Sequence, residues 1–352
     1  MPPAPTANGG GHADRCSERG VSEVGGVDDQ SGLTWRWSRF GLGVAFALPA
    51  MVVTPFSPTL GLAFAVGVLP AAAFRLPPRR RGRAVILLVG ALSAVGLLLG
   101  SLLGTVPAVA VVGVFVAAVL ASITAAHGRL AQLVLILVLP MMGIGLSFPW
   151  SPAAVGLALC IVVGTVYAWL VSLLWPQRDE PPPAAAPVPR GRAMLVYGIL
   201  LGAAAAIAAA VGFLLDLEHV GWATAAVLLV MRPVRGQVIA RSIGRAVSVL
   251  VGALAAAAFA LLAPGDLLIG VVVGVIVAAL CASQESRWYV APGFTTFIAL
   301  TFILVNSSGA PGARFLERAL ETLLGVGLAL FFGAAVPSLL SLFARRRRSM
   351  SV

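Results

Sequence analysis

Long apolar runs recur along this chain, and most of its charged residues lie in the gaps between them. A helix needs about 20 apolar residues to cross the hydrocarbon of a bilayer. The residues AVILMFWYC make up 59% of the chain and the charged residues only 11%, against about 25% charged in soluble domains. The pattern therefore predicts an all-α, polytopic membrane protein with about twelve transmembrane helices. The runs lie near 40–56, 59–74, 84–104, 106–124, 130–147, 153–175, 193–215, 220–231, 246–263, 267–282, 290–305 and 319–343.

The basic residues, all of them arginine, predict the orientation of these helices. With the amino terminus inside, every arginine except Arg314 and Arg318 falls on the cytoplasmic side, as the positive-inside rule requires. We therefore expect a multi-pass protein of the cytoplasmic (plasma) membrane, the cell inner membrane, with both termini cytoplasmic. Nucleic-acid binding would need arginines gathered on one folded surface, and these lie in scattered clusters, so no nucleic-acid partner is expected.

A sequence repeat divides the chain into two halves. Residues 82–92 (GRAVILLVGAL) and 244–254 (GRAVSVLVGAL) match at nine of eleven positions with a spacing of 162, and Gly164 recurs as Gly325. Six spans in each copy give both copies the same orientation, which predicts two parallel six-helix repeats. The expected layout is a disordered cytoplasmic tail (1–34), the first repeat (35–176), a Pro-rich cytoplasmic linker (177–192), the second repeat (193–345) and a basic cytoplasmic tail (346–352).

Several glycines are spaced four residues apart within the predicted spans, at 96–104, 198–202 and 270–274. Small residues at this spacing let two helices approach closely in lipid. We interpret these glycines as packing contacts between helices.

Residues 221–233 (GWATAAVLLVMRP), followed by 241–258 (RSIGRAVSVLVGALAAAA), resemble the signature of the fusaric acid resistance and aromatic acid exporter superfamily, the FUSC-like integral membrane transporters. Residues 314–325 (RFLERALETLLG) resemble the start of that family's last helix. The resemblance implies an organic anion as the substrate. The sequence departs from the family pattern in two ways: only a short linker separates the halves, and 57–74 contains no Trp.

Two short segments at matching places of the repeats are the first candidates for a binding region. The run 220–231 is too short to cross about 30 Å of hydrocarbon, and its counterpart 59–74 contains Pro70. Trp222 and Thr224 would there stack against and hydrogen-bond an aromatic carboxylate. The alternative is that Trp222 is an interfacial anchor.

Charged residues of the second half supply the other candidates. An electropositive cytoplasmic vestibule is the functional interpretation of Arg232, Arg235, Arg241 and Arg245, and positive-inside topology alone is the alternative. Arg314 and Arg318 begin the last helix on the outer side, where topology requires no arginine. With Glu317 and Glu321 they form either a solvated turn of paired charges or part of a polar path. On the path interpretation Asp216, Glu317 and Glu321 would be proton carriers.

These observations predict a multi-pass transporter that exports small organic anions, aromatic ones included, by secondary transport. The alternatives are an organic-anion channel of the same family and a nontransporting membrane assembly or accessory protein. An enzyme is not expected, because the three histidines lie far apart without a nucleophile motif, and no GxxxxGK[ST] loop is present. The three cysteines show no metal-like spacing. We expect no cofactor or metal; the expected partners are the lipid bilayer and a small organic anion, and a homo-oligomer is left open.

Overall fold

The computed structural model describes residues 34–125, 127–177, 189–233, 237–286, 289–306 and 310–339. The two predicted tails, except Thr34, and most of the linker therefore lie outside the described residues. The chain divides into two units, Met1–Gly32 and Leu33–Val352, and all the described residues belong to the second. Regular structure in the described part of the chain is helical throughout, without a strand, as predicted.

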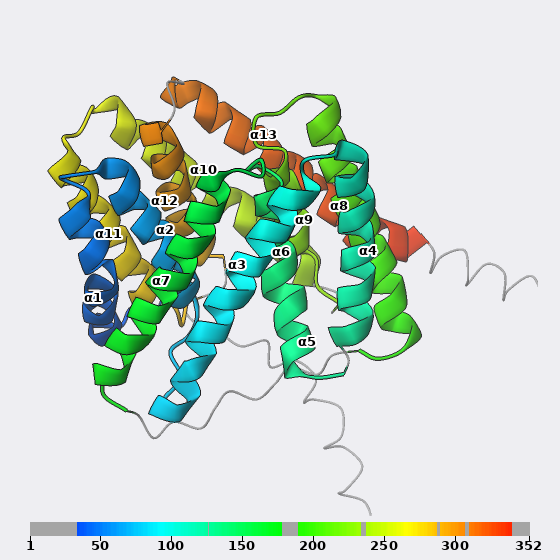
Figure 1. Cartoon of the computed structure of the whole chain (residues 1–352). Helices are drawn as coiled ribbons and strands as arrows, with labels where there is room; N and C mark the ends of the chain where they lie inside the picture. The colour runs from blue at the N-terminus through cyan, green and yellow to red at the C-terminus, as the bar shows by residue number, and fades with distance from the viewer. Residues whose placement is uncertain are drawn as a thin grey trace, which may run out of the picture. The chain divides into compact units, whose positions relative to one another are not determined.

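The helices follow the predicted apolar runs in order (Figure 1). Two of them begin earlier than the apolar runs suggest, so that Arg241 and Arg245 lie inside α10, and Arg314 and Arg318 lie in the first turns of α13. The elements are α1 (Trp37–Val53), α2 (Pro58–Ala73), η1 (Arg80–Ala84), α3 (Val85–Leu103), α4 (Pro107–Ala125), α5 (Arg129–Leu133), the π-helical turn η2 (Val134–Val138), α6 (Leu139–Gly145), α7 (Pro152–Leu174), α8 (Arg192–Leu214), α9 (Gly221–Val230), α10 (Gln237–Leu261), α11 (Asp266–Ala282), α12 (Ala291–Asn306), α13 (Pro311–Leu330) and the π-helical turn η3 (Phe331–Ala335).

Six helical segments of the described residues are long and apolar enough to cross a membrane, which supports the multi-pass assignment. They are Arg80–Leu103, Pro107–Ala125, Pro152–Leu174, Arg192–Leu214, Val238–Leu261 and Pro311–Leu339. Six further apolar helices are shorter: Trp37–Val53, Pro58–Ala73, Leu130–Gly145, Gly221–Val230, Asp266–Ala282 and Ala291–Asn306. The arrangement of all twelve as complete spans stays a prediction.

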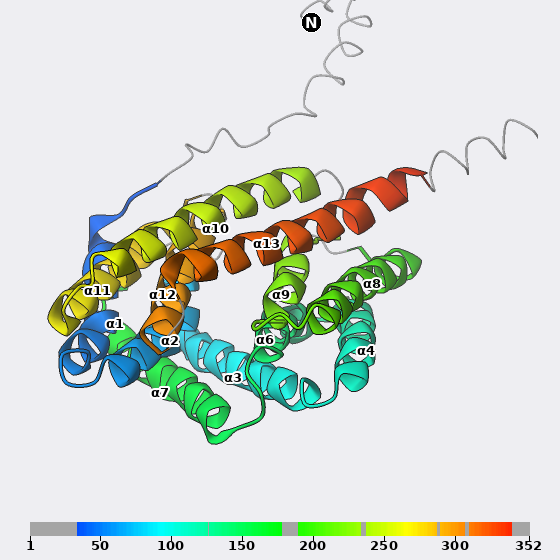
Figure 2. The same cartoon turned by 90° about the horizontal axis from the view of Figure 1, so that it is seen from above.

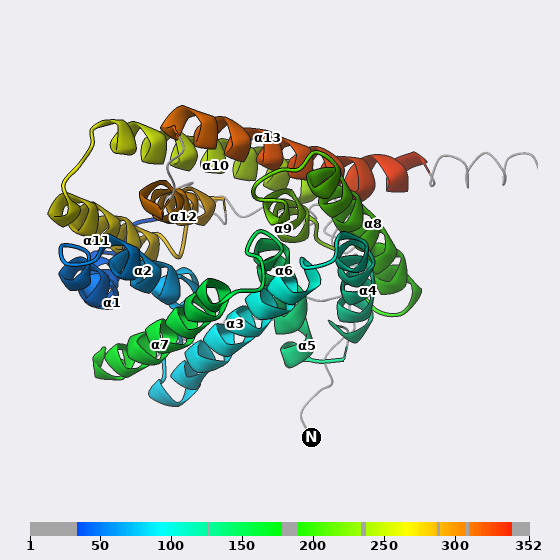
Figure 3. The same ribbon diagram turned by 45° about the horizontal axis from the view of Figure 1, so that its top comes forward.

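Most of the main helix contacts occur twice, because each has a counterpart between the repeat-related helices. α1 packs on α11, and α8 packs on α4. α3 packs on α6 and α7, while α10 packs on α12 and α13. α2 packs on α7, and α9 packs on α13. Figures 2 and 3 show α10 and α13 side by side along one face of the helical unit.

Glycines make the closest of these contacts, as the spacing predicted. A methyl group at Gly198 would come within 2.8 Å of Ser122 on α4, and one at Gly274 would collide with Met51 on α1. The repeat-related Gly164 of α7 lies against the backbone of Gly67 in α2. Gly325 of α13 likewise lies against the Ala223 carbonyl of α9. The contact between α9 and α13 is therefore equivalent to the contact between α2 and α7.

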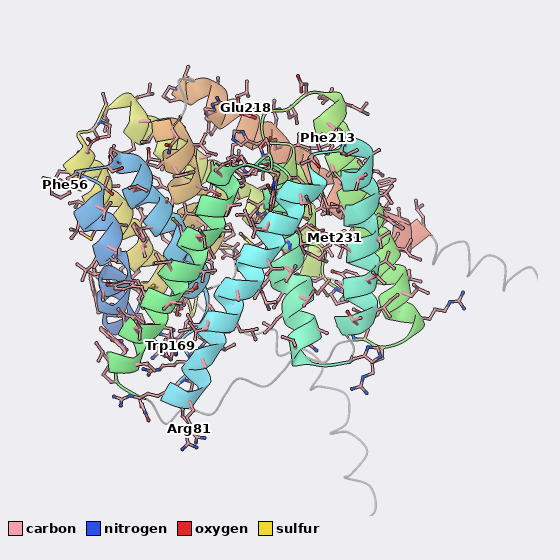
Figure 4. The ribbon with its side chains drawn as sticks, in the orientation of Figure 1. Phe56, Arg81, Trp169, Phe213, Glu218 and Met231 are labelled. Carbon is pink, nitrogen blue, oxygen red and sulfur yellow. The ribbon has the colours of Figure 1, made fainter. Side chains whose placement is uncertain are left out.

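The ends of the first helix of each half lie at the same end of the unit. Figure 4 places Phe56, Phe213 and Glu218 at one end, and Arg81 and Trp169 at the opposite end. Phe56 follows α1, and Phe213 lies in the last turn of α8. α1 and α8 therefore run in the same direction.

Candidate functional site

A cavity of about 450 Å³ lies among the helices of both halves. Both short segments, α2 and α9, contribute to its wall, together with α3, η2, α6, α7, α10, α12 and α13. A cavity of this size is within the range that small organic ligands occupy.

The central wall element is α9, a helix of 10 residues that is apolar on every side. All of its residues except Leu229 are buried, and Leu229 lines the cavity. A helix without a polar face belongs in an interior. Its first residue, Gly221, donates its N–H to Ser147 Oγ at 2.9 Å and lies against the Gly143 carbonyl of α6. This close contact fixes Trp222, the next residue, at the cavity wall.

Charge is distributed unequally over the cavity wall. The four charged residues that line it, Arg232, Arg241, Arg245 and Arg318, all come from the second half of the chain. Ser93 is the one polar side chain that the first half adds, and the other first-half lining residues are apolar. The cavity therefore has an apolar side and a cationic side, and its lining includes no carboxylate.

The repeat relates the two sides of the cavity. At the spacing of 161, Leu157 of α7 corresponds to Arg318 of α13, and both line the cavity. A cation thus stands in the second half where the first half has a leucine. The apolar and cationic sides are equivalent surfaces of the two halves with different side chains.

Arg83 and Arg245, also repeat-related, show how the second half comes to have a cation facing its interior. Arg83 is 1% exposed and donates to main-chain carbonyls at the end of α7: Trp175 at 2.8 Å, Pro176 at 2.8 Å and also Ser172. The corresponding part of α13 remains helical as far as Leu339, so its carbonyls stay within the helix. Arg245 is 8% exposed, its Nε has no hydrogen-bond partner in the described part of the chain, and it lines the cavity.

Arg83 and Arg245 therefore occupy equivalent places in the repeat but different environments. Both are buried at equivalent places of η1–α3 and α10, but one caps a helix and the other faces the cavity. Of the four arginines predicted to form a vestibule, Arg232, Arg241 and Arg245 line this cavity, and Arg235 lies outside the described residues. Their exposure to the cytoplasmic side stays a prediction.

A ladder of contacts joins the turn before α9 to the first turns of α13. Glu218 pairs with Arg314, and His219 Nδ1 lies 3.1 Å from Glu317 Oε1. The next rung is a cation–π contact, with the Arg318 guanidinium 3.9 Å from the ring centroid of Trp222. The rings of His219 and Trp222 also stack, 4.7 Å between centroids.

The turn of paired charges forms only in part. Arg314 and Glu317 pair at 3.1 Å as predicted. Arg318 and Glu321 form no ion pair, because Arg318 packs over Trp222 and neither oxygen of Glu321 has a hydrogen-bond partner among the described residues. The interfacial alternative for Trp222 is wrong, since this residue is 6% exposed and lines the cavity.

The remaining candidates lie outside the cavity wall. Thr224 is fully buried in α9, and its hydroxyl has no partner in the described residues. Arg314 and Glu317 belong to the ladder. Asp216 is exposed just after α8 with φ 49°, a conformation that a helix-ending Asp tolerates. Glu321 is buried behind Arg318.

Three residues of this site were not predicted from the sequence: His219, Thr295 and Thr296. The histidines were weighed only as catalytic residues, although His219 contacts both Trp222 and Glu317. Thr295 and Thr296 of α12 also line the cavity. The adjacent threonines within an apolar run were the available signal, because hydroxyl groups in a span are commonly placed toward other helices.

The fold and the cavity together define a class: a multi-pass helical membrane protein with an internal, arginine-lined cavity. Residues 205–332 match the family model described as fusaric acid resistance protein-like, from within α8 to η3. This match confirms the resemblance found in the second half of the sequence. Neither the curated proteins nor the solved structures give a significant match to the chain.

Proposed function

We propose that this protein moves small organic anions, aromatic ones included, across the cytoplasmic membrane, and that the cavity binds them on the way. The direction that the family resemblance favours is export, by secondary transport. One observation carries the proposal: four arginines face a cavity whose lining contains no carboxylate. The protein is proposed to act without a catalytic residue.

Placing these four arginines inside a membrane costs free energy. An arginine at mid-bilayer costs about 2.5–3.5 kcal/mol on insertion scales, and intramembrane charges are usually paired or functional. Here four such charges share one wall. A bound carboxylate would offset their mutual repulsion, and Arg binds carboxylates through two parallel hydrogen bonds.

The apolar side of the cavity supports an anion with a carbon body. Leu157, Leu97 and Val66 line the cavity and belong to the first half of the chain, whereas the arginines belong to the second half. The carboxylate would lie against Arg245 and Arg318, and its apolar part would lie among the side chains of the first half. Trp222 would stack on an aromatic ring once Arg318 turns to the carboxylate.

We further propose that the two halves are parallel six-helix repeats. The doubled helix contacts, the equivalent glycines at α7 and α13, and the common direction of α1 and α8 all support this arrangement. The cytoplasmic end is then the end of Arg81, and the outer end is that of Glu218. A cavity between two such repeats is where secondary transporters commonly bind their substrates.

The test is the accumulation of a panel of aromatic and aliphatic carboxylates in cells with and without the protein. Export predicts a lower steady-state level of at least one member of the panel in cells that contain the protein. Arg245→Gln should remove the difference at equal membrane abundance. Equal levels of every carboxylate with and without the protein would contradict the proposal.

A channel is the second candidate, because a cavity lined by cations also suits anion permeation. The two are separated in planar bilayers that contain purified protein. A channel carries a steady anion current without a coupled ion, whereas secondary transport is driven by a second gradient.

A further inference from the structure

Glu321 is buried deeply in α13, three residues after Arg318, which lines the cavity. It is 1% exposed, and both of its carboxylate oxygens lack a hydrogen-bond partner among the described residues. A buried carboxylate without donors is unfavourable in its charged form. A leucine or glutamine would fill this position at a lower cost, so packing alone does not explain the residue.

Two charged groups interact with Glu321 electrostatically, and both lie on its own helix: Arg318 and Glu317. Arg318 lines the cavity, so the one cation near Glu321 is also a cation available to a bound anion. Glu317 is already engaged by His219 and Arg314.

The helices packed against α13 add few other titratable groups. They are His219 before α9, Arg232 after it, Arg241 and Arg245 of α10, and Arg192 and Tyr197 of α8; the Tyr197 hydroxyl donates to the Met231 carbonyl. α12 and α9 have none in their described residues. Among the carboxylates of this region, Asp216 is exposed and Glu317 is paired, so Glu321 is the one that combines burial with closeness to a cavity arginine.

We propose that Glu321 binds a proton together with the organic anion in the cavity, so that the two are carried as a pair. This inference rests on the proposed function of the cavity. When a bound carboxylate ligand pairs with Arg318, the positive charge of Arg318 stabilises the ionised form of Glu321 less. Glu321 then accepts a proton from a hydronium ion of the solvent: one O–H bond of the hydronium breaks, one O–H bond forms on a carboxylate oxygen, and a water molecule is left.

The converse follows by thermodynamic linkage. When Glu321 is protonated, it no longer competes with the ligand for Arg318, so the protein binds the anion more tightly. The gain in anion affinity equals the gain in proton affinity that the bound anion causes. One monovalent anion and one proton add no net charge to the membrane interior. The arrangement therefore favours carrying both together over exchanging one for the other, and export of the pair would be driven by the outward concentration gradient of the anion itself.

The experiment measures anion binding and proton uptake on the purified full-length protein in detergent. The probes are benzoate, cinnamate and hexanoate, titrated calorimetrically at about pH 6 and about pH 8, a range in which free carboxylates stay ionised. Repeating the titrations in buffers of different ionisation enthalpy gives the number of protons taken up with each bound anion.

The wild-type protein should bind a probe about tenfold more tightly at the lower pH and take up a proton on binding. Glu321→Gln should bind it with equal affinity at both pH values and take up none. The matched control is Glu218→Gln, which removes a carboxylate that is 58% exposed and should leave the proton uptake unchanged.

Three results would overturn the inference. Proton uptake that persists in Glu321→Gln would assign the proton to another group, such as Glu317 or His219. Binding that depends on Arg245 but not on pH would remove the coupling and leave the proposed function intact. Failure of the wild-type protein to bind any of the probes would remove both.

Discussion

At the scale of single residues, the site depends on where each arginine finds its partner. Arg83 has carbonyl oxygens at the end of α7, and Arg314 has two carboxylates. Arg245 faces the cavity, and Arg318 has an aromatic ring. The first pair is structural and the second is available to a ligand. We therefore expect substitutions within the two pairs to have different consequences.

Arg83→Ala should lower stability. It leaves several buried carbonyls without donors, at a cost of about 1–3 kcal/mol for each. The melting temperature in detergent should fall, and Arg83→Lys should recover only part of the loss because an ammonium cannot reproduce the planar set of donors. The control is Arg81→Ala, an exposed neighbour in η1, which should melt as the wild type does. An unchanged melting temperature for Arg83→Ala would refute the capping role.

Trp222→Leu should lower the affinity for benzoate by about threefold to thirtyfold, the equivalent of a lost aromatic contact of about 0.7–2 kcal/mol. Trp222→Phe retains an aromatic face and should lose less. Equilibrium dialysis measures both. If Trp222→Leu binds benzoate as tightly as Trp222→Phe, the ring only fills space in the wall.

At the scale of helices, the sequence predicted the position of the site better than its chemistry. The short runs that became α2 and α9 both line the cavity, and the glycine spacing identified real contacts. The apolar run predicts the start of α10 too late, because Arg241 and Arg245 are interpreted as residues of the aqueous side, whereas Arg314 and Arg318 lie at the beginning of the last helix as predicted. Charges inside a helix that faces a cavity resemble loop residues in a hydropathy pattern.

Other parts of the site could not be predicted because they depend on contacts between distant segments. His219 and Glu317 meet across the interface of the α9 turn and α13, and no local pattern relates them. The same holds for Arg318 over Trp222. The interior cation at Arg245 depends on α13 continuing where α7 ends, which the repeat itself does not predict.

Paired glycine substitutions test whether α7 and α13 have equivalent packing. Gly164→Val and Gly325→Val should each lower the melting temperature, since overpacking costs typically about 1–3 kcal/mol. Each has a matched control on the same helix, Gly156→Val and Gly327→Val, where an added Cβ would meet nothing within 4 Å. A loss at one glycine of the pair without a loss at the other would contradict the equivalence.

At the scale of the whole molecule, the proposed orientation connects the cavity to two compartments. In a background without cysteines, single cysteines at Ser57 and Asp266 should react with an impermeant thiol reagent added outside intact cells. A cysteine at Gln177 should react only after the cells are opened, because the arginine clusters keep that end in the cytoplasm. Labelling of position 177 alone from outside would invert the orientation.

The proposed function depends on the attraction of an organic anion to the cationic side of the cavity. Equilibrium dialysis of benzoate against the purified protein measures that attraction directly. Arg318→Leu should weaken binding at least about tenfold, the loss expected for a charged hydrogen bond of about 1.5–3 kcal/mol. Leu157→Ala, the repeat-related change that alters the cavity but not its charge, should weaken it much less. Equal binding by wild type and Arg318→Leu, or a greater loss in Leu157→Ala, would contradict the assignment of this cavity as an anion site.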